Sequence, residues 1–197
     1  METNFPESRT VQEITGPWTV AFDPKLGGPP LPVAFDTLQD WTSRLEPGIK
    51  YYSGTATYRK SFDCPLAGSG QRIFLDLGKV QNLAAVKLNG RDLGIVWCAP
   101  WTLEITDDVK LMDNALEIEV VNLWPNRLIG DEQLPEDYER NPNGSLKFLP
   151  DWLLKNTART SGRITFATYN TWKKDDPLLP SGLLGPVTIR EVVASEE

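Results

Sequence analysis

The chain has 197 residues, a formal net charge of −7 and no histidine. The lack of histidine excludes Ser–His and Cys–His nucleophile pairs, imidazole bases and His-ligated metal sites from this chain. The acidic balance argues against nucleic acid and anionic membrane surfaces as partners, because both are bound by clustered Lys and Arg. Catalysis by this chain would have to use carboxylates, Lys, Tyr or an unpaired Cys.

No apolar run approaches the roughly 18 residues that a membrane helix needs. The first residues lack the basic start and apolar run of a signal peptide, so none is expected, although this does not make the chain cytoplasmic. Cys64 and Cys98 lie far apart in the sequence. Two free thiols that pack as small apolar side chains are favoured over a disulfide between them.

Polar residues 1–12 predict a flexible N-terminal segment, followed by a single domain over residues 13–195. The first predicted strand places Trp18, Val20 and Phe22 on one face, and the spacing of residues 35, 38 and 41 indicates a short helical turn or cap. Alternation of apolar and polar residues, broken by Gly, Pro and Asn-Gly, predicts the remaining strands. The predicted strands cover residues 16–23, 54–62, 72–77, two hairpin arms around Asn89-Gly90, 116–120, 163–169 and a last strand within 181–193.

Residues 131–162 are polar and irregular, with one short helix predicted at 151–155 and Asp151 as its N-cap. A loop of this length inside a compact domain is usually functional or disordered. Short strands separated by turn signals are typical of an all-β fold. The sequence therefore predicts an all-β antiparallel β-sandwich or jelly roll, with one or two short helices.

Seven tryptophans are the richest source of candidate binding residues. Trp18 and Trp41 fit the hydrophobic core. The other candidates fall at strand ends or in loops, where aromatic side chains often face a ligand or a neighbouring domain. These are Trp97, Trp101, Trp124 and Trp172.

Polar residues surround Trp124 in the sequence. Arg127 and Asp131 could form a bidentate pair that pins the loop. Alternatively, Asn126 and Arg127 could hydrogen-bond sugar hydroxyls beside Trp124 as an aromatic platform. The structural pin is favoured, because polar loop residues often satisfy only the backbone.

Adjacent carboxylates such as Asp107-Asp108 and Asp175-Asp176 are the remaining candidates for chemistry. A glycosidase needs two carboxylates held roughly 5 to 10 Å apart across a cleft. Each pair here has a turn-like context, so solvated surface charge is the favoured interpretation. The same loops could hold a structural calcium ion, although no spacing matches a calcium-loop motif.

The stretch 83–131 carries a family resemblance. Its Asn89-Gly90, Leu93-Gly94 and Pro100-Trp101 pairs, followed by Asn-x-Leu-x-Ile-x-Val from residue 114, resemble the sugar-binding β-sandwich of glycoside hydrolase family 2. Its ending, Val-Asn-Leu-Trp-Pro-Asn-Arg-Leu-Ile-Gly-Asp at 121–131, is similar to the C-terminal jelly-roll domain of glycoside hydrolase family 106, which contains large α-L-rhamnosidase-like enzymes.

In enzymes that this chain resembles, a separate barrel domain holds the catalytic acids and a calcium site. The resemblance therefore assigns no catalytic residue and no cofactor here. It implies a galactose-binding-domain-like jelly roll that serves as a non-catalytic accessory domain of a large polysaccharide-degrading enzyme, usually secreted or periplasmic. Such a domain would support the catalytic barrel or present a plant-type oligosaccharide to it. Two alternatives stay open: a carbohydrate-binding module that uses the loop tryptophans, and a glycosidase that uses an Asp/Glu pair.

Overall fold

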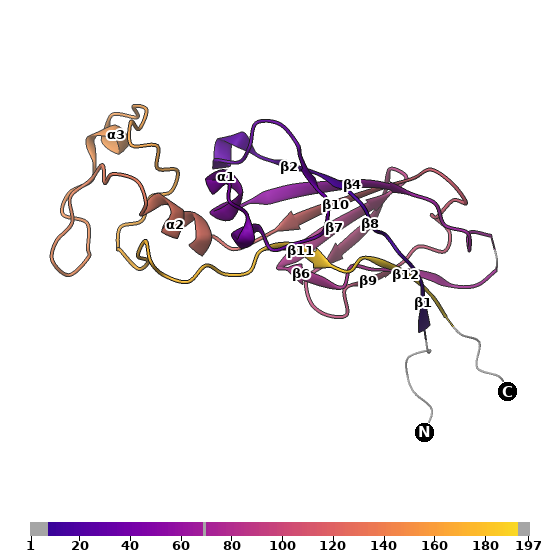
Figure 1. Cartoon of the computed structure of the whole chain (residues 1–197). Coiled ribbons are helices and arrows are strands. Elements are labelled where there is room, and N and C mark those ends of the chain that lie inside the picture. The colour runs from indigo at the N-terminus through magenta and orange to yellow at the C-terminus, as the bar shows by residue number, and fades with distance from the viewer. Residues whose placement is uncertain (1–7, 69, 193–197) are drawn as a thin grey trace, which may run out of the picture.

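Two antiparallel sheets enclose the hydrophobic core in the computed structural model, which describes residues 8–68 and 70–192. One sheet has the strand order β3-β2-β4-β10-β7-β8, the other has the order β1-β12-β5-β9, and β11 pairs with β6 beside them (Figure 1). The predicted all-β antiparallel sandwich is therefore confirmed. It carries three short α-helices, one more than the sequence predicted.

The strands, in chain order, are β1 (Ser8–Glu13), β2 (Trp18–Phe22), β3 (Val33–Phe35), β4 (Thr55–Phe62), β5 (Ile73–Asp76), β6 (Lys79–Gln81), β7 (Leu83–Leu88), β8 (Arg91–Val96), β9 (Thr102–Glu104), β10 (Asn114–Val121), β11 (Gly182–Gly185) and β12 (Thr188–Val192). The helices are α1 (Pro47–Lys50), α2 (Pro125–Asp131) and α3 (Asp151–Leu154), with the 3-10 turns η1 (Pro24–Leu26) and η2 (Trp41–Ser43). Within the described residues, no helix has the length and apolar character needed to cross a membrane.

Alternation in the sequence places the core correctly. In β10, Leu116, Ile118 and Val120 are buried, whereas the intervening glutamates stay partly in solvent. Trp18 and Trp41 are almost fully buried, as predicted. Each buried aromatic or branched side chain contributes roughly 1.5–3 kcal/mol relative to an exposed one, so this alternation is the main source of the sandwich's stability.

The predicted hairpin joins β7 to β8. Asn89 and Gly90 both have positive φ, 53° and 84°, as a tight turn between twisted strands requires. The Asn89 side chain donates to the Asp108 carbonyl at 2.8 Å, and its Oδ1 accepts from the Ala115 amide at 3.0 Å. The turn residue therefore also ties the hairpin to the start of β10.

In two segments, residues 8–12 and 163–169, the observed backbone pairing differs from the prediction. Residues 8–12, predicted to be flexible, lie in β1, which pairs along β12 from Ser8↔Val192 to Glu13↔Thr188. Polar side chains suit this edge strand because its order comes from backbone hydrogen bonds. Residues 1–7, the rest of the predicted flexible segment, and 193–195, the end of the predicted domain, lie outside the described residues, so the domain boundaries stay a prediction.

Residues 163–169, predicted to be a strand, form none, because the amides of Ile164 and Thr165 donate to a side-chain carboxylate instead of a neighbouring strand. Three smaller differences between the predicted and observed elements are given in chain order. Residues 33–43 form β3 and η2 rather than one helical turn. The N-cap of α3 is Pro150, with Asp151 as the first helical residue. The last predicted strand divides into β11 and β12 at Gly185-Pro186.

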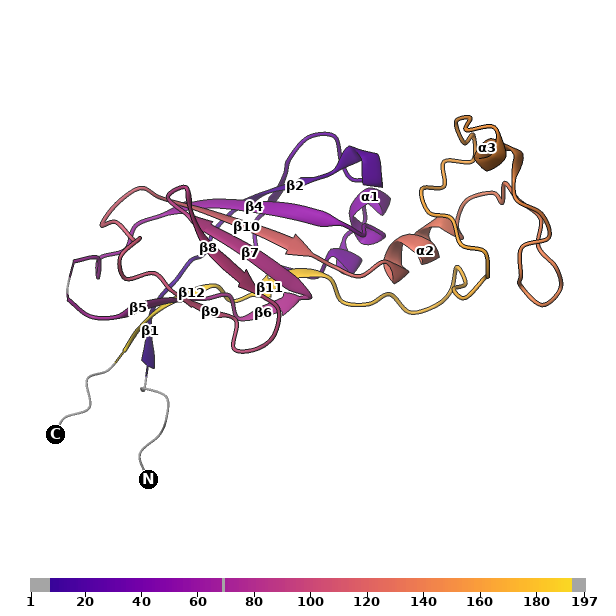
Figure 2. The same cartoon turned by 180° about the vertical axis from the view of Figure 1, so that it is seen from behind.

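Residues 124–180, which we call the lobe, project from one end of the sandwich (Figures 1 and 2). The lobe contains α2 and α3 and is otherwise mostly irregular. The residues of the hydrophobic core cluster all come from outside it. The lobe is therefore held by something other than the sandwich core.

We expect Gly78→Ala to destabilise the fold more than Gly90→Ala. Both glycines have positive φ, so an alanine at either site costs about 1–2 kcal/mol of backbone strain. A Cβ at Gly78 would also lie 2.4 Å from the Gly185 carbonyl carbon, whereas Gly90 has open space. This collision should cost about 1–3 kcal/mol more in urea unfolding. Equal losses for the two variants would contradict the close approach of the chain at Gly78 and Gly185.

Candidate functional site

The motif at 121–131 contains α2, which begins soon after β10 ends. Pro125 occupies the first turn of α2, where its missing amide hydrogen costs no hydrogen bond. Three of the predicted site residues, Asn126, Arg127 and Asp131, are buried in or beside this helix. Trp124 precedes them and is 52% exposed. Sequence neighbours therefore divide between an exposed aromatic ring and buried polar groups.

Asn126 joins the beginning of the lobe to its end. Its Nδ2 donates to the Leu179 carbonyl at 2.7 Å and to Ser181 Oγ at 3.0 Å, and its Oδ1 accepts from the Leu179 amide at 2.8 Å. Ser181 Oγ also accepts from Asn122 Nδ2 at 3.0 Å. Asn122 in turn accepts from the Gly54 amide at 2.9 Å. Both ends of the lobe are thus fastened to the sandwich at one buried polar joint.

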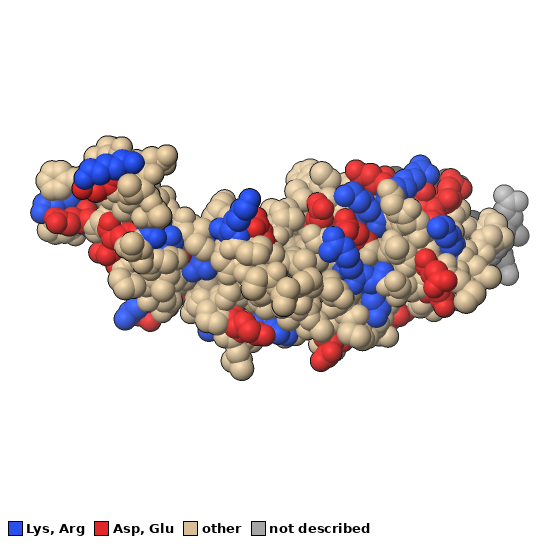
Figure 3. Space-filling view, turned by 90° about the horizontal axis from the view of Figure 1, so that it is seen from above, with Lys and Arg blue, Asp and Glu red and all other residues tan. Residues whose placement is uncertain are grey.

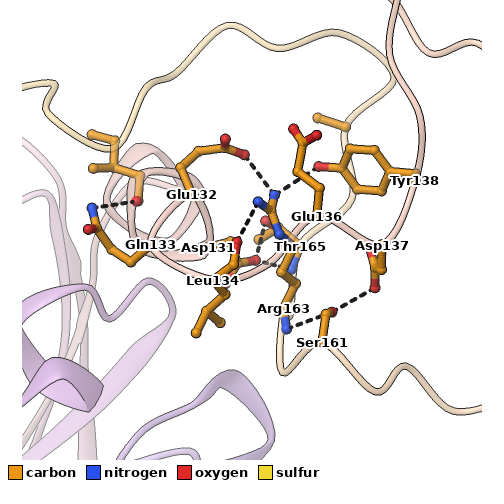
Figure 4. Close-up of polar contacts among 12 residues, drawn as sticks. Asp131, Glu132, Gln133, Leu134, Glu136, Asp137, Tyr138, Ser161, Arg163 and Thr165 are labelled. Carbon is orange, nitrogen blue, oxygen red and sulfur yellow. Dashed lines mark hydrogen bonds and ion pairs between the residues drawn. The ribbon is translucent and has the colours of Figure 1, made fainter.

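Asp131 fastens α2 to the far side of the lobe. Its Oδ2 accepts from the Ile164 amide at 2.9 Å, and from the amide and hydroxyl of Thr165, both at 2.6 Å (Figure 4). Its Oδ1 lies 3.0 Å from Arg127 Nε as an ion pair, and neither of these two atoms has a hydrogen-bond partner of good geometry in the described part of the chain. The expected pair of Arg127 and Asp131 is therefore present and buried, but in the described part of the chain it is one Nε–Oδ1 contact within a helix rather than a bidentate pair in a loop.

Two further arginines brace the irregular part of the lobe. Arg163 pairs with Glu132 at 2.8 Å and donates to Tyr138 Oη at 3.0 Å, and it also donates to two backbone carbonyls of the segment after α2 (Figure 4). The Arg159 guanidinium donates two hydrogen bonds, of 2.8 and 2.9 Å, to the two carboxylate oxygens of Asp137. Such bidentate, charge-assisted pairs are strong and directional. They give a segment without sheets a defined shape.

An aromatic layer lies over these ion pairs. The Phe166 ring makes edge contacts with Tyr138 at 5.8 Å and with Trp152 at 5.3 Å between centroids. The Arg159 guanidinium stacks 4.4 Å above the Trp152 ring. Each such contact adds roughly 0.5–1.5 kcal/mol beyond burial. The lobe therefore has a small aromatic centre of its own.

A mostly apolar groove of about 320 Å³ opens on the surface of the lobe. Beside it lies a smaller cavity of about 60 Å³, which shares Leu128, Thr165 and Ala167 with the groove and is walled by Arg140 and Trp172. The groove, which we call the lobe groove, is lined by Trp124, Leu128, Ile164, Thr165, Phe166 and Ala167.

The structure brings five of the seven predicted site residues to the lobe. Trp124 lines the lobe groove, Trp172 lines the adjacent cavity, and the three polar residues are buried in α2. Trp97 and Trp101 lie elsewhere, on the loop between β8 and β9. Trp97 is 73% exposed, whereas Trp101 is half-buried and packs against the core. Ligand binding by any of these residues stays a prediction.

Sequence reasoning missed the arginine and aromatic residues that give the lobe its shape. Tyr138, Arg140, Arg159, Arg163 and Phe166 pair with partners up to 31 positions away in the sequence. The available signal was their frequency in a segment that otherwise reads as polar loop. Composition of that kind distinguishes a braced loop from a disordered one, because disordered segments are poor in aromatic residues.

The carboxyl groups whose pKa departs from its usual value all depart downward. Hydrogen bonds from Arg44, Arg72, Arg159 and Lys147 lower the pKa of Glu46, Glu104, Asp137 and Glu139, respectively. A glycosidase's general acid needs the opposite shift, produced by burial or by a second carboxylate. These four groups are therefore suited to ion pairing and unsuited to proton donation near neutral pH.

Among residues 8–68 and 70–192, no group of three or more Cys, Asp and Glu side chains is placed to hold a metal ion. The structural calcium ion stays a prediction. Cys64 and Cys98 are free thiols, as favoured, but only the buried Cys64 packs as a small apolar side chain, because Cys98 is exposed.

Comparison with known proteins places this geometry among glycoside hydrolases. No family model matches the chain. A putative beta-glucuronidase of Formosa agariphila is 49% identical over 182 residues, which cover 91% of this chain and 16% of that protein. The solved structure of a rhamnosidase from Novosphingobium sp. PP1Y matches 97% of this chain and 16% of its own, with 35% identity and a TM-score of 0.77.

The beta-D-glucuronidase of Dictyoglomus thermophilum shares the fold alone, with 20% identity and a TM-score of 0.58. The chain is thus a glycoside hydrolase-related β-sandwich domain. It spans about 16% of the length of the putative beta-glucuronidase and of the rhamnosidase.

We expect Asp131→Ala to cost about 3–5 kcal/mol of unfolding free energy, because it leaves the buried Arg127 without its counter-charge. Asp151→Ala is the matched control. It breaks the Asp151–Lys155 pair, which has the same four-residue spacing but is largely exposed, and should cost under about 1 kcal/mol. Urea unfolding monitored by tryptophan fluorescence measures both. Similar losses would show that the Asp131 pair contributes no more than a surface pair.

We expect the lobe to loosen in acid before the sandwich does. The pKa of Asp137 is lowered chiefly by its hydrogen bonds from Arg159, so its stabilising contribution is present above the unfolded value of about 3.9. That contribution is lost as the pH falls through the lower, folded pKa. Amide exchange over residues 159–165, corrected for intrinsic rates, should therefore accelerate below about pH 4.

The matched variant for this experiment is Asp137→Asn. Its exchange over residues 159–165 should already be fast at pH 6 and should lack the acid-induced step. Wild-type exchange that stays constant from pH 6 to pH 2 would show that this carboxylate does not hold the lobe.

Proposed function

We propose that this chain is a non-catalytic accessory domain of a larger, α-L-rhamnosidase-like glycoside hydrolase, equivalent to the C-terminal jelly-roll domain of glycoside hydrolase family 106. The observation that carries the proposal is the match of 97% of this chain to only 16% of a rhamnosidase, at 35% identity. In this account the catalytic acids belong to the remainder of the polypeptide, a barrel domain that the sandwich supports. The parent enzyme would be secreted or periplasmic.

The use of the polar residues of α2 supports this role. The Asn126 amide group hydrogen-bonds Leu179 and Ser181 through both its nitrogen and its oxygen. The Asp131 carboxylate faces Arg127 and accepts from the Ile164 amide. The Asn126 amide and the Oδ2 atom of Asp131 have little to offer a sugar hydroxyl without breaking these bonds. They act as tertiary fasteners, as a supporting domain requires.

A carbohydrate-binding module is the second candidate. Trp124 is half-exposed beside the lobe groove and Trp97 is mostly exposed on the sandwich, and flat aromatic surfaces of this kind stack against sugar rings. A plant-type oligosaccharide would be the ligand. Calorimetric titration with rhamnose- and galactose-containing oligosaccharides tests this candidate. Binding heat that disappears in Trp124→Ala or Trp97→Ala would establish it.

The accessory role predicts two results. The purified chain should not accelerate hydrolysis of aryl α-L-rhamnoside or aryl β-D-glucuronide above the rate in buffer. An antibody raised against the chain should detect, in the source cells or their medium, a polypeptide several times its size. Hydrolysis by the purified chain that is abolished by a single Asp or Glu substitution would contradict the proposal and support a glycosidase.

A further inference from the structure

The lobe projects from the sandwich and supplies none of the residues of its core cluster. Its two ends nevertheless meet at the Asn126–Ser181 joint. It leaves the sandwich after β10 and returns directly before β11. A closed excursion of this kind cannot serve as a linker between domains, because its ends are fixed side by side.

Large apolar side chains are left in solvent over the lobe. Such residues are common singly on any surface, whereas a contiguous apolar patch marks a contact surface. Of the exposed apolar residues of the lobe, Trp124 lines the lobe groove. The exposed apolar residues of the lobe, each at least 44% exposed, are Trp124, Phe148, Leu149, Leu153, Leu154 and Tyr169.

The charges of the lobe are balanced and largely paired. Residues 124–180 contain eight Lys or Arg and eight Asp or Glu, so the net charge of −7 comes from the rest of the chain. The lobe's buried arginines face their own carboxylates. In Figure 3 both signs are interspersed over the visible face. A neutral, internally paired surface with an apolar groove favours a dry protein contact over a charged ligand.

We infer that the lobe groove is the docking site for an apolar surface of the catalytic domain of the same polypeptide. This rests on the proposed function, and three observations favour that occupant. The chain spans only 16% of the rhamnosidase, so most of such an enzyme lies outside it. The groove is open and its lining is mainly apolar. The terminal strands β1 and β12 lie at the end of the sandwich away from the lobe (Figures 1 and 2).

This arrangement gives the sandwich two separate attachments. Whatever continues the chain joins it near β1 or β12, and the lobe groove adds a non-covalent contact at the opposite end. A covalent connection raises the effective concentration of the second contact, so a modest apolar area suffices to hold it. Two distant attachments fix the orientation of the sandwich on its neighbour, which one flexible connection does not.

A glycan is the less suitable occupant of the lobe groove. Sugar recognition needs free donors and acceptors beside the aromatic surface. Around Trp124, the amide of Asn126 and the Oδ2 atom of Asp131 are already hydrogen-bonded within the lobe, and the Oδ1 atom of Asp131 faces Arg127 as an ion pair. The groove lining itself contributes one hydroxyl, on Thr165, and that hydroxyl donates to Asp131.

Hydroxyl-radical footprinting with mass spectrometry tests the docking site. The oxidation rate of Trp124 is measured in the isolated 197-residue chain and in the full-length polypeptide. Trp97 is the matched internal control, because it is also an exposed tryptophan but lies on the β8–β9 loop. We expect Trp124 to be oxidised at least tenfold more slowly in the full-length polypeptide, with the rate of Trp97 unchanged.

The outcomes separate this inference from the proposed function. If the native polypeptide is no longer than the chain itself, the proposed function fails. If a long polypeptide exists but Trp124 is oxidised equally fast in both forms, the docking site alone is overturned. If Trp124 in the full-length polypeptide is protected only after rhamno-oligosaccharide is added, the lobe groove is a glycan site and docking is overturned.

A variant provides the second measurement. Trp124→Ala in the full-length polypeptide should raise the rate of proteolytic cleavage between domains several-fold, because it removes the largest apolar side chain of the groove. Leu45→Ala is the control, since Leu45 is 93% exposed and lies outside the lobe. Equal cleavage rates for both variants would overturn the docking site.

Discussion

The buried carboxylate of Asp131 is the contact on which the lobe depends. It ends α2, faces the guanidinium of Arg127, and takes the amide hydrogens of two residues more than thirty positions later. A buried charge is tolerated only when its partners are in place, because desolvation costs several kcal/mol. The buried Asp131 carboxylate therefore favours the one fold of the lobe in which its partners surround it. Two of those partners, Ile164 and Thr165, line the lobe groove.

Two kinds of interaction thus stabilise different parts of the chain. The sandwich is a hydrophobic structure, in which alternating residues of the paired strands fill a common interior. The lobe is a polar structure, in which arginines satisfy carboxylates and backbone carbonyls and an aromatic layer covers them. Hydrophobic burial is non-directional, whereas bidentate pairs fix both distance and angle. The second kind suits a surface that must keep its shape without a large core.

The sequence allowed the sandwich to be predicted because its rule is local. Period-two alternation in β2, β4 and β10 and the Asn89-Gly90 turn are readable without knowing what they pack against. The same rule misled at 163–169, where alternation is present but the amides of Ile164 and Thr165 are claimed by Asp131. It also missed β1, whose polar residues are ordered by backbone pairing with β12. In both segments the backbone conformation is set by partners far away in the sequence, and these partners cannot be read from one sequence.

The candidate site was also predictable only in part. The motif at 121–131 singled out these residues, but their helix α2 was not predicted, and the Arg127–Asp131 pair was expected from its opposite charges as the pin of a loop. The lobe groove was not predictable, since Ile164 and Phe166 reach Trp124 only through the folding of the intervening loop. The relation to glycoside hydrolases came from resemblance and agrees with the comparisons, whereas the choice of rhamnosidase-like function remains a proposal.

A structure of the full-length polypeptide, by crystallography or electron cryo-microscopy, tests the account most directly. The account predicts that side chains of the catalytic domain fill the groove between Trp124 and Phe166 while the lobe keeps the shape described above. A full-length structure in which that groove faces solvent, or in which the lobe unfolds from Asp131 to reach another domain, would contradict it.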